Sequence, residues 1–377
     1  MKALEANASV ALGARIGVLG AGQLGRMLGL AGRALGFELC FLDPSADSPA
    51  AAVGELLVAD YSDEVALGRL AQADVITFEF ENVPVQALKT LEERAKVFPS
   101  SRALELAQDR LHEKNCFRAL GIGTPPFEPV ESWDELSAAL SRVGLPAVLK
   151  TRRFGYDGKG QAVLRSEADA KVAFERLGGV PLILEGFVKF QRELSIIAVR
   201  ARGGEVASYP LVENHHQGGI LRKTLAPAPG VTEQLMRVAR QHVEKLLAHL
   251  DYVGVLALEL FEVDGQLLAN EIAPRVHNTG HFTIEGARTS QFENHLRAIL
   301  GLPLGATEVP EPCAMLNLIG VAPDLAAILS VPDAHLHWYG KEPRPGRKVG
   351  HVTVRAPDAA SLAERVVELE RLIESSV

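Results

Sequence analysis

The stretch Leu267-Leu-Ala-Asn-Glu-Ile-Ala-Pro-Arg-Val-His-Asn-Thr-Gly-His281 places a dense group of polar side chains directly behind an apolar run. A second carboxylate, Glu259, ends the preceding apolar run, and the two runs predict a β-hairpin over 253–273. Two carboxylates and an amide on paired strands suit a hard divalent cation, because such ions take oxygen ligands and are often shared with nucleotide phosphates. The alternative is an ordinary hairpin with polar residues on its solvent face.

The register of this hairpin tests the metal prediction. A two-residue turn at Asp264-Gly265 would place Glu259 opposite Asn270, with Glu271 on the other face. A loop of odd length, often with a glycine bulge, puts both glutamates on one face. Glutamates on opposite faces of a hairpin without a bulge would rule out a shared metal.

Composition excludes several classes of protein. The 377 residues predict two or three domains, and 47% hydrophobic with 23% charged residues is typical of a soluble globular protein. The net charge of −8 and the lack of a Lys/Arg block argue against a nucleic-acid partner. The chain has no apolar run of about 18 residues, so no membrane partner is expected. Three scattered cysteines suggest neither a disulfide framework nor a zinc site, and a reducing cytoplasm fits best.

The first part of the chain has the pattern of a parallel α/β sheet. Strands are expected at 15–19, 38–42 and 74–80, with a helix from the glycine turn to about 35. The turn, Gly20-Ala-Gly-Gln-Leu-Gly25, fits Gly-x-Gly-x-x-Gly, whose backbone N–H groups can hold a phosphate. Asp43 lies where a dinucleotide fold has its acidic ribose contact. Alone, these features predict an NAD(P) enzyme, and a purely structural tight turn is the alternative.

A second glycine-rich loop joins the strands expected at 147–151 and 161–164. Gly155, Gly158 and Gly160 allow a hairpin tip to approach a phosphate closely, and Lys150 and Lys159 supply positive charge. This is not the Walker pattern. A solvated hairpin is the alternative, although a lysine that ends a buried strand usually has an anionic partner.

The segment 335–351 is basic, aromatic and rich in turns, in contrast to the acidic chain around it. Surface charge is one interpretation, and a mobile arm that closes on an anionic substrate is the other. The neighbours His215 and His216 are expected to point to opposite faces of a strand. The segment 185–188 could present a carboxylate and backbone groups to a nucleotide.

Five motifs together resemble the N5-carboxyaminoimidazole ribonucleotide synthetase family of the ATP-grasp superfamily. They are Gly22-Gln-Leu-Gly-Arg-Met27, Phe78-Glu-Phe-Glu-Asn-Val83, Gly155-Tyr-Asp-Gly-Lys-Gly-Gln161, the 270–281 motif and Pro345-Gly-Arg-Lys-Val-Gly-His351. The resemblance implies an α/β and α+β fold. A Rossmann-like domain over 1–115 would precede an ATP-grasp domain over 116–302 and a small C-terminal domain over 303–377.

The resemblance also implies a purine-biosynthetic ligase, a cytoplasmic homodimer that uses ATP, Mg²⁺, bicarbonate and 5-aminoimidazole ribonucleotide. Glu259 and Glu271 would bind the metal, and Lys150, Asp157 and Arg275 would be catalytic. The implied ATP contacts are Arg110, Lys150, Gly155, Tyr156, Asp157, Gly158, Lys159, Gly160, Gln161, Glu185, Gly186, Phe187, Val188, Glu193, His216, Asn270 and Glu271. The implied ribonucleotide contacts are Gly22, Gln23, Leu24, Glu79, Asn82, Tyr156, Asp157, Arg275, His277, Asn278, Lys341, Arg347 and Lys348.

Three other functions remain open at this point. One is a different ATP-grasp ligase, such as a formate-dependent ribonucleotide transformylase or a biotin carboxylase. The second is an NAD(P) oxidoreductase, which would leave the carboxylate pair and the second glycine loop unexplained. The third is a nucleotide-binding regulatory subunit, which the intact Lys150, Glu259, Glu271 and Arg275 argue against.

Overall fold

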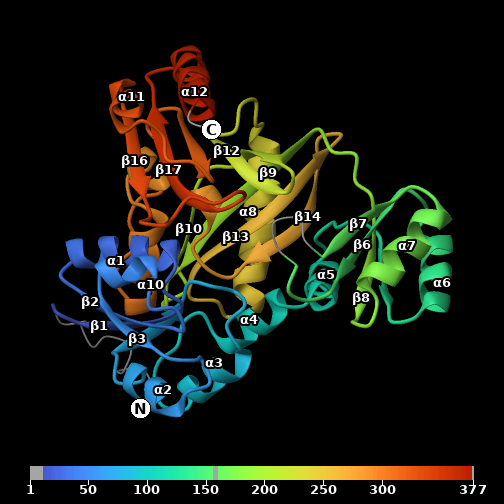
Figure 1. The fold of residues 1–377 in the computed structure, drawn as a ribbon, viewed down its shortest axis with the longest axis horizontal. Helices are drawn as coiled ribbons and strands as arrows, with labels where there is room; N and C mark the ends of the chain where they lie inside the picture. The colour runs from blue at the N-terminus through green and yellow to red at the C-terminus, as the bar shows by residue number, and fades with distance from the viewer. Residues whose placement is uncertain (1–11, 156–159, 376–377) are drawn as a thin grey trace.

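The computed structural model describes residues 12–155 and 160–375. Its first unit is a parallel sheet with strand order β3-β2-β1-β4, at the blue end of the chain in Figure 1. The strands are β1 (Arg15–Leu19), β2 (Glu38–Asp43), β3 (Glu55–Val58) and β4 (Val75–Phe78). Its helices are α1 (Gln23–Ala34), η1 (Pro49–Ala52), α2 (Glu64–Leu70), α3 (Val85–Glu92), α4 (Ser101–Ala107) and α5 (Arg110–Ala119).

One detail of this unit corrects the sequence prediction. The strand expected at 74–80 ends at Phe78, so Glu79 lies just beyond it. Val97 forms only an isolated bridge to Ile76. The carboxylate of Asp109 accepts the N–H groups of Leu111 and His112, and it starts α5 as a helix separate from α4.

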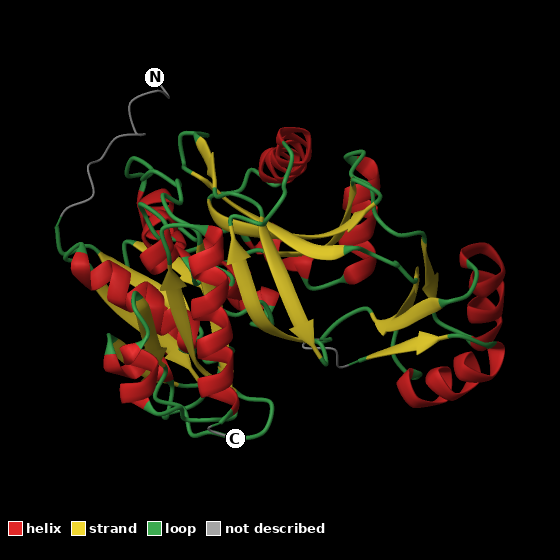
Figure 2. Cartoon of the chain, turned by 90° about the horizontal axis from the view of Figure 1, so that it is seen from above, coloured by secondary structure: helices red, strands yellow, loops and turns green. Residues whose placement is uncertain are grey.

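A small antiparallel sheet projects from the rest of the molecule (Figure 2) and carries α6 and α7. Its strands, in the order β5-β8-β6-β7, are β5 (Phe127–Val130), β6 (Ala147–Thr151), β7 (Gln161–Leu164) and β8 (Leu182–Gly186). The helices are α6 (Trp133–Val143) and α7 (Glu167–Leu177), and a capping box between Ser166 and Asp169 starts α7. The second glycine loop joins β6 to β7, as expected.

The remaining strands form one large antiparallel sheet in the order β14-β13-β9-β11-β12-β15-β17-β16, with β10 paired to β9. They are β9 (Arg192–Arg200), β10 (Val206–Ser208), β11 (Val212–Gln217), β12 (Ile220–Ala226), β13 (Gly254–Val263), β14 (Gln266–Ala273), β15 (Cys313–Ile319), β16 (Ala334–Trp338) and β17 (Lys348–Arg355). The helices are α8 (Glu233–His249), η2 (Asn278–Gly280), α9 (Thr283–Gly286), α10 (Gln291–Leu300), α11 (Leu325–Ser330) and α12 (Ala359–Glu374).

This sheet runs across the boundary expected at residue 303, because β12 pairs with β15. The segment 335–351 is not simply a mobile arm: both of its ends lie in strands, β16 and β17, which pair with each other, and His351 is buried. The loop between the two strands keeps the basic residues.

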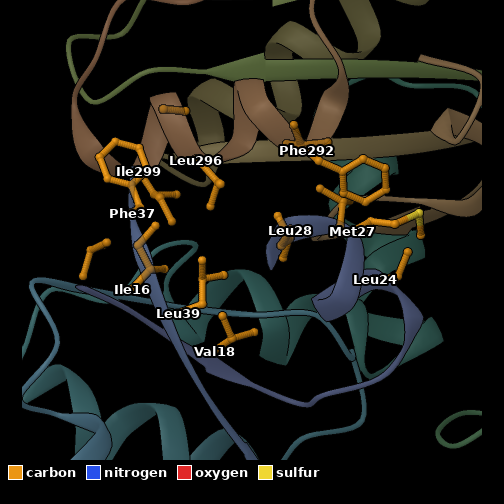
Figure 3. Close-up of a cluster of buried hydrophobic side chains, with 14 of the residues drawn as sticks. Ile16, Val18, Leu24, Met27, Leu28, Phe37, Leu39, Phe292, Leu296 and Ile299 are labelled. Atoms are coloured by element: carbon orange, nitrogen blue, oxygen red, sulfur yellow. The ribbon is translucent and has the colours of Figure 1, made fainter. Parts of the chain in front are cut away.

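The first unit and the large sheet share a hydrophobic core (Figure 3). Met27 and Leu28 of α1 face Phe292, Leu296 and Ile299 of α10 in this buried cluster. The apolar residues of α1 recur at helical spacing, which explains the face that it buries. A buried hydrogen bond of 2.8 Å between Thr77 Oγ1 and His295 Nε2 joins the same two parts. This packing fixes the end of the first unit against the large sheet.

Among the described residues, no helix has both the length and the apolar character of a membrane span.

Candidate active site

A cavity of about 470 Å³ lies where the first unit, the small sheet, the large sheet and the β16–β17 segment meet. Most of the residues implied by the motifs line it: Gln23, Leu24, Arg110, Lys150, Gly155, Gln161, Glu185, Gly186, Phe187, Val188, Glu193, His216, Glu259, Asn270, Glu271, Arg275, His277, Asn278 and Lys348. Asn82 lines a smaller adjoining cavity. Gly22, Glu79, Gly160, Lys341 and Arg347 line neither, and Tyr156, Asp157, Gly158 and Lys159 lie outside the described residues.

The hairpin β13–β14 brings both glutamates to this cavity. It combines a two-residue turn with a bulge, and this combination was not predicted from the sequence. Its turn has two residues, since Val263 pairs with Gln266. The register nevertheless shifts between Leu258, which faces Ile272, and Leu260, which faces Ala269. Glu259 therefore opposes both Asn270 and Glu271, which is a β-bulge. Of the two alternatives, the two-residue turn forms, and the bulge, in place of an odd-length loop, brings both glutamates to one face.

The two carboxylates repel each other and are only partly compensated by the protein. Burial, followed by the charge of Glu271, raises the pKa of Glu259 to about 7. Burial alone would also raise the pKa of Glu271, but the guanidinium of Arg110, 2.8 Å away, lowers it. The Nε2 atom of His277 lies 3.3 Å from Glu259. A bound cation would relieve the repulsion that remains.

This donor set fits a metal that is shared with a ligand. In the described ranges, no group of three His, Cys, Asp or Glu side chains is arranged to hold a metal by itself. Two carboxylates occupy only some of the coordination positions of a hard cation. Mg²⁺ commonly fills its other positions with oxygens of water and of substrate phosphates. The geometry thus suits Mg²⁺ that arrives with a nucleotide.

Lys150 enters the cavity from the end of β6 and meets Glu185 of β8. Its ammonium lies 3.1 Å from Glu185 Oε2, and a second, buried ammonium, that of Lys114, lies 3.4 Å from the same oxygen. Burial opposes ionisation, but the two lysines outweigh it and lower the pKa of Glu185 to about 2. The other oxygen, Glu185 Oε1, is buried with no hydrogen-bond partner. Glu185 is therefore an ionised carboxylate with an acceptor free for a ligand.

The glycine turn after β1 is filled by the chain's own carboxylates. Glu79 accepts the N–H of Gly22 at 2.9 Å and that of Gly25 at 3.3 Å, and Asp43 accepts the N–H of Ala21 at 2.9 Å. A Cβ atom on Gly20 would lie 2.7 Å from Glu79. Asp43 is thus a structural residue of the turn, and its reading as a ribose contact is wrong. The turn faces the cavity through Gln23 and Leu24 instead.

The basic loop between β16 and β17 meets this turn. Lys341 donates a hydrogen bond to the side chain of Gln23, and Lys348 lines the cavity. Arg347 donates to the backbone oxygen of Glu342 at 3.2 Å and lies outside the cavity. The structure therefore brings the two predicted anion-binding segments together, although they are more than 300 residues apart in the chain.

Several residues of the 270–281 motif line the cavity. Arg275 is paired with Glu81, an acidic residue that the sequence analysis left out of the site, and it donates to Val276 O at 2.9 Å. Burial, followed by the charge of Arg275, holds the pKa of His277 well below its usual value, so the ring is neutral. Both polar atoms of the Asn278 side chain are buried without a partner. They are available to a ligand.

His215 and His216 point apart, as predicted. A register shift lies between them, His216 lines the cavity and contacts Glu193, and His215 is paired with Glu213 at 3.0 Å.

Several lining residues were not found from the sequence. Phe190 and Phe261 stack at 4.8 Å between ring centroids, and Leu221 and Tyr339 also line the cavity. Leu221 and Phe261 lie on β12 and β13, whereas Phe190 and Tyr339 lie in connecting segments, so only the folded chain reveals them. Lys114 could have been found from the sequence, because it lies on the same face of α5 as Arg110 at a spacing of four residues.

Three family models match the chain. The description of the first is "ATP-grasp domain", over residues 115–292. The second is a ribonucleotide synthetase preATP-grasp domain, over residues 14–108. The third is a phosphoribosylaminoimidazole carboxylase C-terminal domain, over residues 313–365.

Relatives cover nearly the whole chain. An N5-carboxyaminoimidazole ribonucleotide synthase from Pseudomonas aeruginosa is 55% identical over 96% of this chain and 100% of its own length. A solved synthetase from Thermus thermophilus is 58% identical, with a TM-score of 0.92 over 95% of this chain and 98% of its own. A synthase from Aspergillus clavatus, solved with ADP and 5-aminoimidazole ribonucleotide, is 34% identical, with a TM-score of 0.90 over 97% and 99%.

Proposed function

The chain belongs to the N5-carboxyaminoimidazole ribonucleotide synthase family of ATP-grasp enzymes, and we propose that it carboxylates 5-aminoimidazole ribonucleotide with bicarbonate and ATP. The products are the N5-carboxylated ribonucleotide, ADP and phosphate. The observation that carries this proposal is the bulge in β14, which puts Glu259 and Glu271 in one cavity with Lys150. The comparisons favour this reaction over the transformylase, biotin carboxylase and oxidoreductase alternatives.

The first step is phosphoryl transfer. A bicarbonate oxygen attacks the γ-phosphorus of ATP, the bond to the β-phosphate oxygen breaks, and ADP leaves with that electron pair. Such transfer depends mainly on positioning and charge neutralisation. Lys150 and the backbone of the 155–161 loop would hold the phosphates, and Glu259 and Glu271 would hold Mg²⁺. Bound there, Mg²⁺ would neutralise phosphate charge.

The second step is carboxyl transfer. Carboxyphosphate breaks its carbon–oxygen bond to give CO₂ and phosphate, and the exocyclic amine of the ribonucleotide attacks the carbon and loses a proton. Arg275 would orient the planar oxyanion, because its guanidinium presents paired donors. Asp157 is proposed as the proton acceptor. His277, neutral at physiological pH, can donate a hydrogen bond without adding charge.

Nucleotide and ribonucleotide would occupy opposite ends of the cavity. Glu185 Oε1 and the 186–188 backbone would meet the adenine end, with Phe187 and Phe190 as apolar walls. The ribonucleotide phosphate would lie between Gln23 or Leu24 and the basic loop with Lys348, while Asn278 would bind the sugar or base. Asn82, which lines the adjoining cavity, would contact the sugar or base from the loop after β4. Glu79 is not included, because both of its carboxylate oxygens accept N–H groups of the glycine turn.

ADP release measured with and without each substrate tests the function. We expect rapid ADP formation only when bicarbonate and 5-aminoimidazole ribonucleotide are both present with ATP. A requirement for formate, or ADP formation that ignores the ribonucleotide, would contradict the proposal. The family resemblance also leads us to propose a cytoplasmic homodimer, which analytical ultracentrifugation tests for the oligomeric state and cell fractionation for the location.

A further inference from the structure

Two adjacent residues of α5, Glu113 and Lys114, contact the backbone of β14 at the bulge. Glu113 Oε1 accepts the N–H of Ile272 at 2.7 Å. The Lys114 ammonium donates to the carbonyl oxygen of Asn270 at 2.7 Å and to that of Ala269 at 3.3 Å. Both side chains are buried, with exposed fractions of 2% and 0%. The contacts lie on both sides of Glu271 along the strand.

The geometry at Lys114 is specific to a bulge. In a regular strand, consecutive carbonyl groups point to opposite edges of the sheet. Here the carbonyls of Ala269 and Asn270 both reach one ammonium, so the chain is turned between them. β14 is the edge strand of the large sheet, and its outer backbone groups have no neighbouring strand. Gly123 and Thr124 also bond the backbone of Ala269, at 2.7 and 3.0 Å, whereas α5 supplies the partners of Asn270 O and the Ile272 N–H. Burying them without partners would destabilise the bulge.

The same contacts link the bulge to the nucleotide end of the cavity. Lys114 lies 3.4 Å from Glu185 Oε2, which Lys150 also contacts. One turn earlier on α5, Arg110 contacts the side chain of Glu271 at 2.8 Å. A single face of α5 therefore reaches the backbone of the bulge, one carboxylate of the proposed metal pair and the partner of Lys150.

We propose that Glu113 and Lys114 are positioning residues that fix the β14 bulge and thereby hold Glu259 and Glu271 at the spacing a shared cation requires. Neither needs to touch substrate or metal. The inference rests on the proposed metal site and adds the residues that fix its geometry. An alternative role, in which Lys114 only neutralises Glu185, would leave the hairpin unaffected when Lys114 is replaced.

The variants are Lys114→Met, which keeps length but loses all donors, and the pair Glu113→Leu and Glu113→Gln. The Gln variant retains an oxygen that can accept the Ile272 N–H, whereas the Leu variant does not. Lys245→Met is the matched control, because Lys245 donates to the backbone oxygen of Leu120, beyond the far end of α5, at 3.1 Å and does not line the cavity. Near-ultraviolet circular dichroism checks that each variant folds.

Two readouts are independent of turnover. Calorimetric titration of the ADP complex measures Mg²⁺ affinity, and hydrogen exchange of the metal-free protein measures opening at the Ile272 amide. We expect Lys114→Met and Glu113→Leu to weaken Mg²⁺ binding roughly 10–100-fold, as loss of residues that orient metal ligands does. Exchange at Ile272 should become faster in both. Glu113→Gln should stay near wild type, and Lys245→Met should match it.

Wild-type Mg²⁺ affinity in folded Lys114→Met and Glu113→Leu would overturn the inference. If Lys114→Met fails to fold, equal affinities in Glu113→Leu and Glu113→Gln would overturn it. Glu259→Gln separates the two proposals: if it binds Mg²⁺ as tightly as wild type, the metal assignment fails. In that case only the hydrogen-exchange rate at the Ile272 amide tests the positioning role. An unchanged rate in Glu113→Leu would refute it.

Discussion

At the scale of single residues, the charged groups of the site are held by partners from distant parts of the chain. Glu271 meets Arg110, Glu185 meets Lys114 and Lys150, and Arg275 meets Glu81. The family motifs named both members of the Arg110–Glu271 and Lys150–Glu185 pairs and one member of the other two. Glu81 was missed because nothing in the sequence shows which distant elements meet. Lys114 was missed although it lies one helical turn after Arg110.

Lys348 provides the test of ribonucleotide binding. It lines the cavity at the start of β17, directly after the loop that meets the first glycine turn. A charge-assisted phosphate contact contributes roughly 1.5–3 kcal/mol, so Lys348→Ala should raise KM for the ribonucleotide by about tenfold or more. KM for ATP should change little. Weaker ATP binding with normal ribonucleotide binding in steady-state kinetics would place the loop in the nucleotide site.

The raised pKa of Glu259 predicts how Mg²⁺ affinity depends on pH. Burial and the nearby Glu271 raise the pKa of Glu259 to about 7 in the metal-free protein. Because this pKa is raised, the carboxyl takes up a proton as the pH falls below about 7, and Mg²⁺ must displace that proton. Mg²⁺ affinity of the ADP complex should fall by up to about tenfold for each pH unit below 7. Calorimetry at several pH values measures it, and a flat profile across this range would exclude Glu259 as a ligand.

At the scale of elements, hydrophobic periodicity predicted the long helices and the strands with apolar runs. It located β1, β6, β7 and the β13–β14 hairpin closely. It missed β5 and β12, where polar residues interrupt the pattern, and α6, whose apolar residues do recur at helical spacing. The bulge was foreseen as a requirement of the metal site, but its combination with a two-residue turn was not, because β14 contacts the distant helix α5 and the sequence does not show that contact.

The loop between β6 and β7 is tested at Gly160. Its φ of +72° suits glycine, and a Cβ atom there would lie 2.7 Å from Thr151 Oγ1. Gly144, in the same part of the molecule, has a φ of +82° and open space around it, so Gly144→Ala is the matched control. Both variants should lose about 1 kcal/mol of unfolding free energy. Only Gly160→Ala should also raise KM for ATP, and equal kinetic effects would show that this loop is a structural hairpin.

At the scale of the whole molecule, four parts of the chain build one cavity. The first unit is fixed by the packing of α1 on α10, and the C-terminal strands continue the large sheet through β15. Sequence motifs predicted the order of these parts and their family. They did not predict the continuous sheet, because pairing of β12 with β15 joins segments separated by α8, the β13–β14 hairpin and α10.

Because the first unit and the large sheet share a core, a core substitution far from the cavity should change ribonucleotide binding. Leu296 is fully buried between α10 and α1, and Leu369 is fully buried in the core of the C-terminal strands and α12. Truncation of either to Ala should cost about 2–5 kcal/mol of unfolding free energy. Leu296→Ala should also raise KM for the ribonucleotide, because the first unit carries Gln23 and Leu24. Equal KM values in the two variants would show that this packing does not position the ribonucleotide site.

If bicarbonate attacks ATP in this cavity, one bicarbonate oxygen must be transferred to the phosphate product, and isotope labelling measures that transfer. Bicarbonate labelled with ¹⁸O is mixed with enzyme, ATP and the ribonucleotide, and the phosphate product is analysed by mass spectrometry before the label exchanges with water. We expect each phosphate to carry one oxygen from bicarbonate, since that oxygen forms the bond to the γ-phosphorus. Phosphate whose new oxygen comes from water would contradict it.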